Sequence, residues 1–273
     1  MLTFFSDYQK KSQIAFPEFS GTRVLMMPIV LGDINSVPEF LEHYKPFLIN
    51  LFKMQNHDGE IGYLTIDEKE VFEGKSQRRM GMHIDGMEPR NFPHLYELGK
   101  GSHASGSWGG GSSGSWGGGS SPEDTTRPKP SPTPAPVKPH SPKPQMEGAL
   151  EASPKTSGYG NGMLLVSSHT GCKAWKQWFH GIPGIEGECD HFSDQIENGT
   201  SKVLEPNTVY WLDPFCVHES LPQPQRIKRQ LVRLSLPSLC GWPESCTQNP
   251  LGIMPSGNIL PYRTEFMVDA NYQ

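Results

Sequence analysis

The segment Gln230-Leu-Val-Arg-Leu-Ser-Leu236 decides how the fold of this chain is interpreted. Successive side chains of a β-strand point to opposite faces, so Leu231, Arg233 and Ser235 would share one face. The opposite face would carry Val232, Leu234 and Leu236. We therefore expect a strand whose apolar face packs in a core, while the other face presents a guanidinium and a hydroxyl group.

Other short segments have the β-branched and aromatic composition of strands, and Gly, Pro or Asn bounds several of them. They are residues 22–30, 61–66, 79–85, 162–168 and 208–212. The charged residues 67–70 are expected to form a turn between the second and third of these. Short strands separated by turns favour a mainly β fold, an antiparallel sandwich or a jelly roll.

One helix is expected near the start of the chain, from about residue 37 to residue 54. Ser36 and Glu39 have the spacing of a capping box, and Pro38 falls in the first turn, where proline is tolerated. Apolar side chains then recur at intervals of three and four, which predicts one apolar face that packs on the rest of the fold. They are Val37, Phe40, Leu41, Tyr44, Phe47, Leu48, Leu51 and Phe52.

Residues 99–157 differ in composition from the rest of the chain, because 11 Gly and 10 Pro make up 21 of these 59 residues. Such a composition is typical of disordered, low-complexity sequence. The eight-residue repeat of 105–112 recurs at 113–120, and Pro alternates with other residues across 128–144. The alternating segment favours polyproline II and a partner domain that binds proline, although a solvated loop is the simpler interpretation. We expect a single domain of residues 1–98 and 158–273 with 99–157 as an insertion.

Charge and composition narrow the function classes. The net charge of −5 argues mildly against a dedicated duplex-DNA binder, which usually has a basic excess. No apolar run has the length of a membrane span, and the N-terminal residues lack the order of a signal peptide. Five cysteines are too few and too scattered for a disulfide scaffold. These features predict an intracellular protein, cytoplasmic or nuclear, with no membrane partner.

Two histidines and an aspartate are the candidates for chemistry. On a strand at 79–85, His83 and Asp85 would point to the same face, and His218 follows the strand at 208–212. Two histidines and one carboxylate can form the facial triad of non-haem Fe(II) oxygenases. The three remaining positions of an octahedral metal stay open for a cosubstrate and O₂. We therefore expect His83, Asp85 and His218 to bind a metal ion.

The order His83-x-Asp85, then His218, then Arg233-x-Ser235 resembles the H-x-D…H…R-x-S signature of the Fe(II)/2-oxoglutarate-dependent dioxygenases. The resemblance covers about residues 60–98 and 158–237. It implies a double-stranded β-helix, a jelly-roll barrel, preceded here by the N-terminal helix and interrupted by the insertion. It also implies that the catalytic residues His83, Asp85 and His218 are the iron ligands.

The same resemblance implies the cosubstrate site and the reaction. Arg233 and Ser235 match the residues that bind the far carboxylate of 2-oxoglutarate, and Arg229 competes with Arg233 because it shares its side of the strand. The implied reaction couples decarboxylation of 2-oxoglutarate by O₂ to oxidation of a substrate C–H bond. The substrate is left open: a small molecule, a protein side chain, or a methylated nucleobase as in the TET-like branch.

Other interpretations remain open at this point. A jelly-roll binding module without catalysis, whose Pro-rich arm at 128–144 recruits a partner, would also fit the composition. A cupin-like enzyme fits less well, because the expected H-x-H motif followed by Glu is absent. His169, Cys172, Cys189 and His191 could form a tetrahedral zinc site, although the single residue between the last two is a tight spacing.

Overall fold

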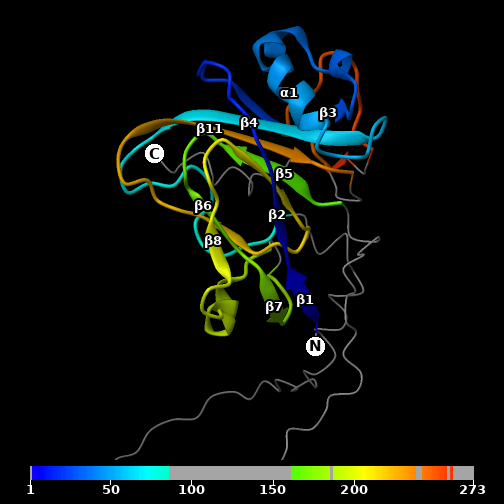
Figure 1. Cartoon of the computed structure of the whole chain (residues 1–273). Coiled ribbons are helices and arrows are strands. Elements are labelled where there is room, and N and C mark those ends of the chain that lie inside the picture. Colours follow the sequence, from blue (N-terminus) through cyan, green and yellow to red (C-terminus); the bar gives the residue numbers. More distant parts are fainter. Residues whose placement is uncertain (1, 86–160, 185–186, 238–241, 257–258, 261–273) are drawn as a thin grey trace, which may run out of the picture. The chain divides into compact units, whose positions relative to one another are not determined.

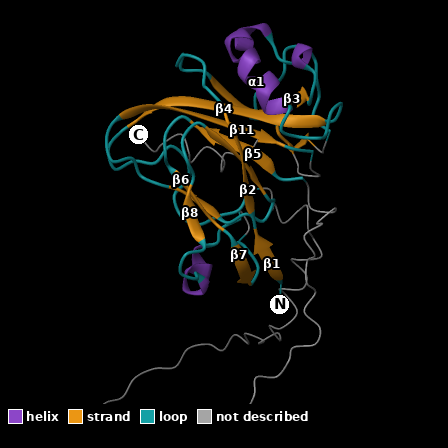
Figure 2. Ribbon diagram, in the orientation of Figure 1, coloured by secondary structure: helices purple, strands orange, loops and turns teal. Residues whose placement is uncertain are grey.

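The computed structural model describes residues 2–85, 161–184, 187–237, 242–256 and 259–260, which form a mainly β structure (Figures 1 and 2). The fold class expected from the sequence is confirmed at this level. The predicted insertion at 99–157, with its repeats and the Pro-rich segment 128–144, lies outside the described residues. In the described part, no helix has the length and apolar character needed to cross a bilayer.

The larger sheet has six strands in the order β2-β9-β5-β11-β4-β3, with every neighbouring pair antiparallel. Its strands are β2 (Tyr8–Gln13), β9 (Thr208–Leu212), β5 (Met163–Ser167), β11 (Ile227–Ser235), β4 (Ile61–Val71) and β3 (Arg23–Val30). The strand expected at 208–212 is confirmed at both ends, and those expected at 22–30, 162–168 and 230–236 are confirmed with small shifts.

The other described strands lie in three smaller sheets. The three-stranded sheet has the order β10-β6-β8, from β10 (His218–Ser220), β6 (Cys172–Trp175) and β8 (Ser201–Val203). His83 adds a single antiparallel bridge to His218 at the free side of β10. Two further pairs are β1 (Thr3–Ser6) with β7 (Gln177–His180), and β12 (Trp242–Pro243) with β13 (Ile259–Leu260).

The chain alternates between the two main sheets. It passes from β4 in the larger sheet to His83 beside the smaller one, and then to β5 in the larger sheet. After β6 and β8 in the smaller sheet it returns through β9, β10 and β11, which lie in the larger, smaller and larger sheet in turn. This alternation brings His83 and His218, which are far apart in sequence, to neighbouring backbone positions.

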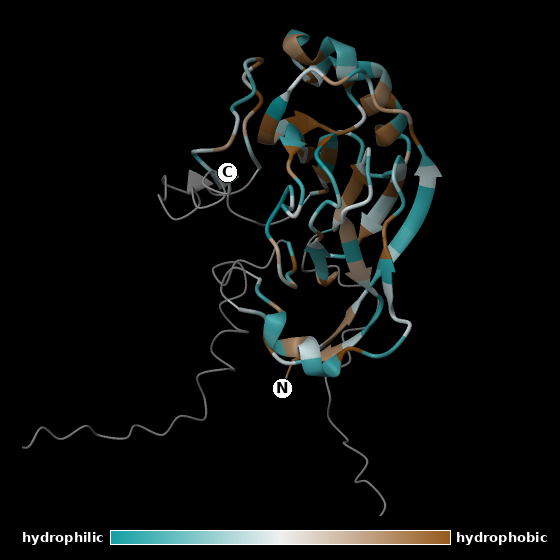
Figure 3. Ribbon diagram, turned by 90° about the vertical axis from the view of Figure 1, so that its left-hand side faces the viewer, coloured by the Kyte–Doolittle hydropathy of each residue, from teal (hydrophilic) through white to brown (hydrophobic). Residues whose placement is uncertain are grey.

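The main apolar core lies between the larger sheet and the N-terminal helical segment. Val232, Leu234 and Leu236 of the β11 segment are buried there together with Leu48 and Leu51 of α1 (Lys45–Phe52). Figure 3 shows apolar stretches in the strands next to the helical segment. Leu231 belongs to a different cluster on the other side of the sheet. The alternation predicted for this strand is confirmed.

The single helix predicted for about 37–54 is wrong in its extent. The segment forms two 3₁₀ turns, η1 (Ile34–Ser36) and η2 (Glu39–Tyr44), before the α-helix α1 begins at Lys45. Leu41 has non-helical dihedral angles, and Pro46 lies in the first turn of α1. Because proline has no N–H to donate and its ring clashes with the carbonyl four residues earlier, a continuous helix through this point is disfavoured.

The predicted capping box is also absent. The Ser36 hydroxyl accepts from the backbone N–H of Val30 at 3.1 Å and donates to the carbonyl of Asp33 at 2.6 Å. The side chain that caps a helical turn is that of Asp33, which accepts from the backbone N–H of Asn35. Ser36 therefore ties the first helical turn to β3 instead of starting a long helix.

The turn predicted at 67–70 is wrong, because β4 continues to Val71 and pairs with β11 through this region. The buried Glu68 carboxylate accepts hydrogen bonds from the backbone N–H groups of Ser20 and Thr22, from the Tyr44 hydroxyl and from Gln230 Nε2. A charged residue can stay in the strand here because its oxygens are satisfied by fixed donors.

The strand predicted for 79–85 is reduced to the bridge at His83. Gly81 has a φ of +83°, which is outside the β region and interrupts any regular strand. The alternation nevertheless holds after the glycine, since Met82 and Ile84 are buried in an apolar cluster with Phe192. His83 and Asp85 therefore face away from that cluster.

Candidate metal centre

The two histidines are held together by their backbones. The N–H of His83 donates to the carbonyl of His218 at 2.9 Å, and the N–H of His218 donates to the carbonyl of His83 at 2.9 Å. Residues paired in this way across an antiparallel bridge project their side chains to the same face. The centroids of the two rings are 4.4 Å apart.

Asp85 completes a group whose ligating atoms lie within 4.8 Å of one another. Within this group, His218 Nε2 lies 3.5 Å from Asp85 Oδ2. His83, Asp85 and His218 could therefore hold one metal ion, and the convergence expected from the sequence is confirmed. Among the described residues this is the one group of histidine, cysteine and acidic side chains with such a geometry.

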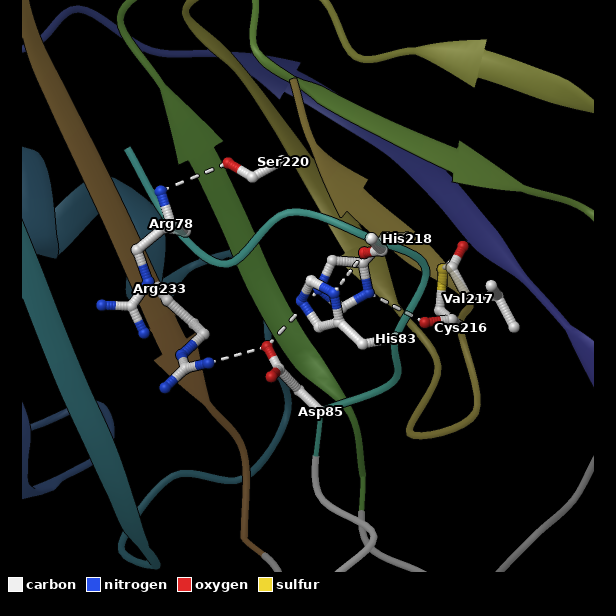
Figure 4. A network of polar contacts seen from close by, with 9 residues as sticks. Arg78, His83, Asp85, Cys216, Val217, His218, Ser220 and Arg233 are labelled. Carbon is white, nitrogen blue, oxygen red and sulfur yellow. Dashed lines mark hydrogen bonds and ion pairs between the residues drawn. The ribbon is translucent and has the colours of Figure 1, made fainter. Parts of the chain in front are cut away.

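The ring orientations suit metal binding. His83 Nδ1 lies 2.8 Å from the carbonyl oxygen of Gly81. His218 Nδ1 lies 2.9 Å from that of Cys216 (Figure 4). A carbonyl oxygen can only accept, so each Nδ1 carries the proton and donates. The Nε2 atom of each ring is left with its lone pair, which is the usual arrangement of a histidine ligand fixed by a second hydrogen bond.

The loop that carries His83 is fixed from the side of η4 (Asp190–Gln195). Asp190 Oδ1 accepts from the backbone N–H of Met82 at 2.7 Å, and the backbone N–H of Cys189 donates to the carbonyl of Met82 at 2.7 Å. A Cβ atom on Gly81 would lie 2.8 Å from Asp190 Oδ2. Glycine is therefore needed at position 81 both for its positive φ and for the close approach of Asp190.

The protonation states also favour a metal site. Burial, together with the neighbouring His218, lowers the pKa of His83 to about 3, so His83 is neutral at pH 7. Burial alone would raise the pKa of Asp85, but the Arg233 guanidinium holds it well below its usual range. A neutral imidazole and an ionised carboxylate are the forms that bind metals.

The triad lines a cavity of about 130 Å³ between the two main sheets. Arg233 lines the same cavity, and its Nη1 atom donates to Asp85 Oδ2 at 2.7 Å (Figure 4). Ser235 does not line the cavity, although it is on the same face of β11. Of the two residues expected to bind 2-oxoglutarate, the structure therefore brings Arg233 to the metal group and leaves Ser235 apart.

Arg229 is the second guanidinium of β11 in this cavity, and it is 1% exposed. Its Nε donates to Ser167 Oγ at 2.9 Å, while its Nη1 has no hydrogen-bond partner among the described residues. Burial lowers the pKa of Arg229 to about 10, which still leaves it charged at pH 7. A buried cation with an unsatisfied N–H is a receptor for an anion.

Two further arginines of the cavity lining, Arg78 and Arg79, come from the segment before the metal loop. Strand alternation over 79–85 would put Arg79 on the face of His83, but no pattern singles out Arg78. Arg78 reaches the cavity through the pairing of the sheets, which no local sequence pattern shows.

The alternative zinc site is not formed in the described part of the chain, since His169, Cys172, Cys189 and His191 do not converge. His169 is exposed, whereas Cys172 and Cys189 are buried in different apolar clusters.

Comparison of the chain with family models, curated proteins and solved structures found no match.

Proposed function

We propose that this chain is an Fe(II)- and 2-oxoglutarate-dependent dioxygenase. The observation that carries the proposal is a single cavity with two elements. One is the group of His83, Asp85 and His218, with both Nε2 atoms available. The other is the buried guanidinium of Arg229, with an unpartnered N–H. The first suits a metal with open coordination positions, and the second suits the far carboxylate of a bound diacid.

The order of the strands supports a double-stranded β-helix as the architecture. In such a jelly roll, consecutive strands pass between two facing sheets. The chain alternates between the larger and smaller sheets from β4 through His83 and β5 to β6, and again from β8 through β9 and β10 to β11, in agreement with that path. Between these two runs, β7 pairs with β1. The candidate metal group then lies between the sheets, where a ligand can be enclosed.

The donor set fits iron(II). Two imidazoles and one carboxylate form the facial triad of non-haem Fe(II) oxygenases, and the carboxylate is partly exposed, with 34% of its side-chain surface accessible. When bound, iron(II) with 2-oxoglutarate and O₂ supplies a reaction in which the cosubstrate becomes succinate and CO₂ while one oxygen atom enters a substrate C–H bond. The backbone carbonyls of Gly81 and Cys216 hold both rings in the ligating tautomer.

The two guanidiniums of β11 have different roles in this proposal. Arg233 contacts Asp85, so it orients a ligand carboxylate and keeps it ionised. Arg229 is the better receptor for the far carboxylate of 2-oxoglutarate, because its Nη1 has no partner among the described residues and Ser167 fixes its Nε. The sequence signature favoured Arg233 and Ser235 for this role, and a comparison of the two arginine variants decides between them.

Turnover of 2-oxoglutarate tests the proposal. We expect the purified chain to convert 2-oxoglutarate to succinate only with Fe(II) and O₂, faster in the presence of an oxidisable substrate pool. His83→Ala should abolish succinate formation, whereas His57→Ala, in the loop before β4, should retain it. A non-catalytic binding module would give no succinate above the metal-free background in any of these samples.

The same assay identifies the class of substrate. Small molecules, protein side chains and methylated nucleobases, including the TET-like reaction, are distinguished by which pool raises the rate. The partner recruited through 128–144 stays a prediction, because that segment lies outside the described residues.

A further inference from the structure

A buried hydroxyl group takes part in the pairing of β10 with β6, one residue before His218. The N–H of Trp175 donates directly to the carbonyl of Val217 at 3.0 Å. In a regular antiparallel pair, the N–H of Val217 would donate back to the carbonyl of Trp175. Instead, it donates to Ser6 Oγ at 2.9 Å, and this hydroxyl donates to the Trp175 carbonyl at 2.5 Å. The Ser6 side chain therefore bridges the two strands at this point.

Ser6 is held in this position by its own strand. It is the last residue of β1, it is 0% exposed, and it pairs with Gln177 of β7. Both roles of the hydroxyl are fixed, because a carbonyl oxygen can only accept and a backbone N–H can only donate. Without the hydroxyl, Val217 and Trp175 would each retain a buried backbone group without a partner, unless the two strands moved together to pair directly. Loss of Ser6 Oγ therefore favours a displacement of Val217.

A displacement of Val217 affects both groups that orient the second histidine of the metal group. His218 follows Val217 directly, and the backbone of His218 forms the two hydrogen bonds to His83. Cys216 precedes Val217, and the Cys216 carbonyl accepts from His218 Nδ1 at 2.9 Å (Figure 4). Val217 therefore lies between the ring that would bind the metal and the carbonyl that fixes the tautomer of this ring.

The same N-terminal strand also supports the first histidine. Phe4 of β1 is 1% exposed and belongs to the apolar cluster that contains Met82 and Ile84, the two neighbours of His83. Val217 belongs to the same cluster. Strand β1 therefore contributes to the packing behind both segments that carry the histidines.

We infer that Ser6 is a positioning residue for the metal group, because its hydroxyl sets the spacing of β10 and β6 and thereby the place of His218 Nε2. The inference rests on metal binding by His83, Asp85 and His218, which is part of the proposed function, and extends it to the N-terminal strand. Ser6 does not line the cavity, so it acts through Val217 and not on a ligand. Metal–ligand distances vary by only about 0.2 Å, so a small displacement of one ligand weakens binding.

Anaerobic titration of the metal-free chain with Co(II) tests the inference, because the visible bands of this ion report the geometry of its ligands. Ser6→Ala should lower the Co(II) affinity at least fivefold. It should also change the position or the intensity of the visible bands of the bound ion, which a loss of stability alone would leave unaltered.

Ser36→Ala is the matched control, because Ser36 is another buried serine whose hydroxyl joins two backbone groups. It is 3% exposed, it accepts from the N–H of Val30 and donates to the carbonyl of Asp33, and it lies outside the cavity lining. Both variants should unfold at a lower denaturant concentration than the unaltered chain. Only Ser6→Ala should alter the Co(II) affinity and the visible bands.

Unchanged Co(II) affinity and bands in the folded Ser6→Ala variant, or an equal loss of affinity in both variants, would overturn the inference. Should Ser6→Ala not fold, amide hydrogen exchange of the unaltered chain, followed by NMR, decides. The Val217 amide should then be protected to within tenfold of the Trp175 amide, and exchange at the rate of an exposed amide would overturn the inference. Absence of Co(II) binding by the unaltered chain would instead overturn the proposed metal group on which the inference rests.

Discussion

Arg233 and Asp85 form an ion pair at 2.7 Å, so the arginine that matches the dioxygenase signature contacts a candidate metal ligand. Arg229 lies four residues earlier on the same face of β11, in the same cavity, and its Nη1 has no hydrogen-bond partner among the described residues. The face of β11 therefore presents two cations that differ in their surroundings. Arg233 is paired with Asp85 through Nη1, and its buried Nε has no partner in the described part of the chain. Arg229 is held through Nε by the neutral Ser167 hydroxyl and has the unpartnered Nη1.

Arg229→Gln should raise the apparent KM for 2-oxoglutarate by about 10- to 100-fold, because a charge-assisted hydrogen bond contributes roughly 1.5–3 kcal/mol. Arg233→Gln should change this KM less and should lower kcat more, since Asp85 loses the guanidinium that fixes it. Steady-state kinetics with 2-oxoglutarate as the varied substrate measure both. The reverse pattern would return the carboxylate-binding role to Arg233.

Gly81→Ala should destabilise the metal loop and weaken metal binding. The substitution places a Cβ atom 2.8 Å from Asp190 Oδ2 at a φ of +83°, and a non-glycine residue in that region costs of order 1–3 kcal/mol. Gly59→Ala is the control, because its φ is +86° but a Cβ atom would meet nothing within 4 Å. Denaturant unfolding and metal titration should show a loss of metal affinity for the first variant alone. Equal metal affinity in both variants would mean that Asp190 does not fix the loop.

Glu68→Ala should lower the free energy of unfolding by about 2–4 kcal/mol. The substitution leaves the N–H groups of Ser20 and Thr22 without their acceptor, and each unsatisfied buried group costs about 1–3 kcal/mol. Glu70→Ala on the same strand removes an exposed ion pair with Arg226 and should cost less than about 1 kcal/mol. A loss of similar size in the two variants would contradict the role of Glu68 as a buried acceptor of several hydrogen bonds.

Asp213→Asn should stabilise the protein at neutral pH and have less effect in acid. Burial raises the pKa of Asp213 to about 6, with a further contribution from the nearby Asp7. A carboxyl group whose folded pKa exceeds its unfolded value of about 3.9 favours folding below that value, and this contribution is lost as the pH rises through about 6. Asparagine keeps the acceptor for the backbone N–H of Phe215 without the buried charge.

Thermal unfolding of the Asp213→Asn variant and of the unaltered chain at pH 4.5 and pH 7.5 measures this difference. The gain in stability should be larger at pH 7.5. An equal gain at both values would show that the Asp213 carboxyl is ionised throughout this range.

Sequence patterns predicted the parts of the fold that depend on local alternation. The two faces of β11 and the limits of β9 follow from strand periodicity alone, and so does the shared face of His83 and Asp85. The pairing of His83 with His218 depends on sheet topology, yet its consequence was predictable because the residue types and their order matched a known signature.

Two parts of the fold were predicted wrongly, one because of long-range hydrogen bonds and the other because of a proline. The charged residues 67–70 resemble a turn, but Glu68 is satisfied by donors from residues 20, 22, 44 and 230, which no local window contains. The apolar spacing of 37–54 predicts one helix, whereas the α-helix begins only at Lys45 and has Pro46 in its first turn. Arg229 and Arg233 could not be told apart as receptors for a carboxylate until the ion pair of Arg233 with Asp85 was known.

Anaerobic titration of the metal-free chain with Fe(II) shows whether His83, Asp85 and His218 bind a metal ion. We expect one ion bound per chain, lost in His83→Ala and Asp85→Ala and retained in His57→Ala. We also expect a new visible absorption band when 2-oxoglutarate is added to the iron-loaded chain. Absence of stoichiometric Fe(II) binding, or equal binding by the His83→Ala and His57→Ala variants, would contradict metal binding by this group.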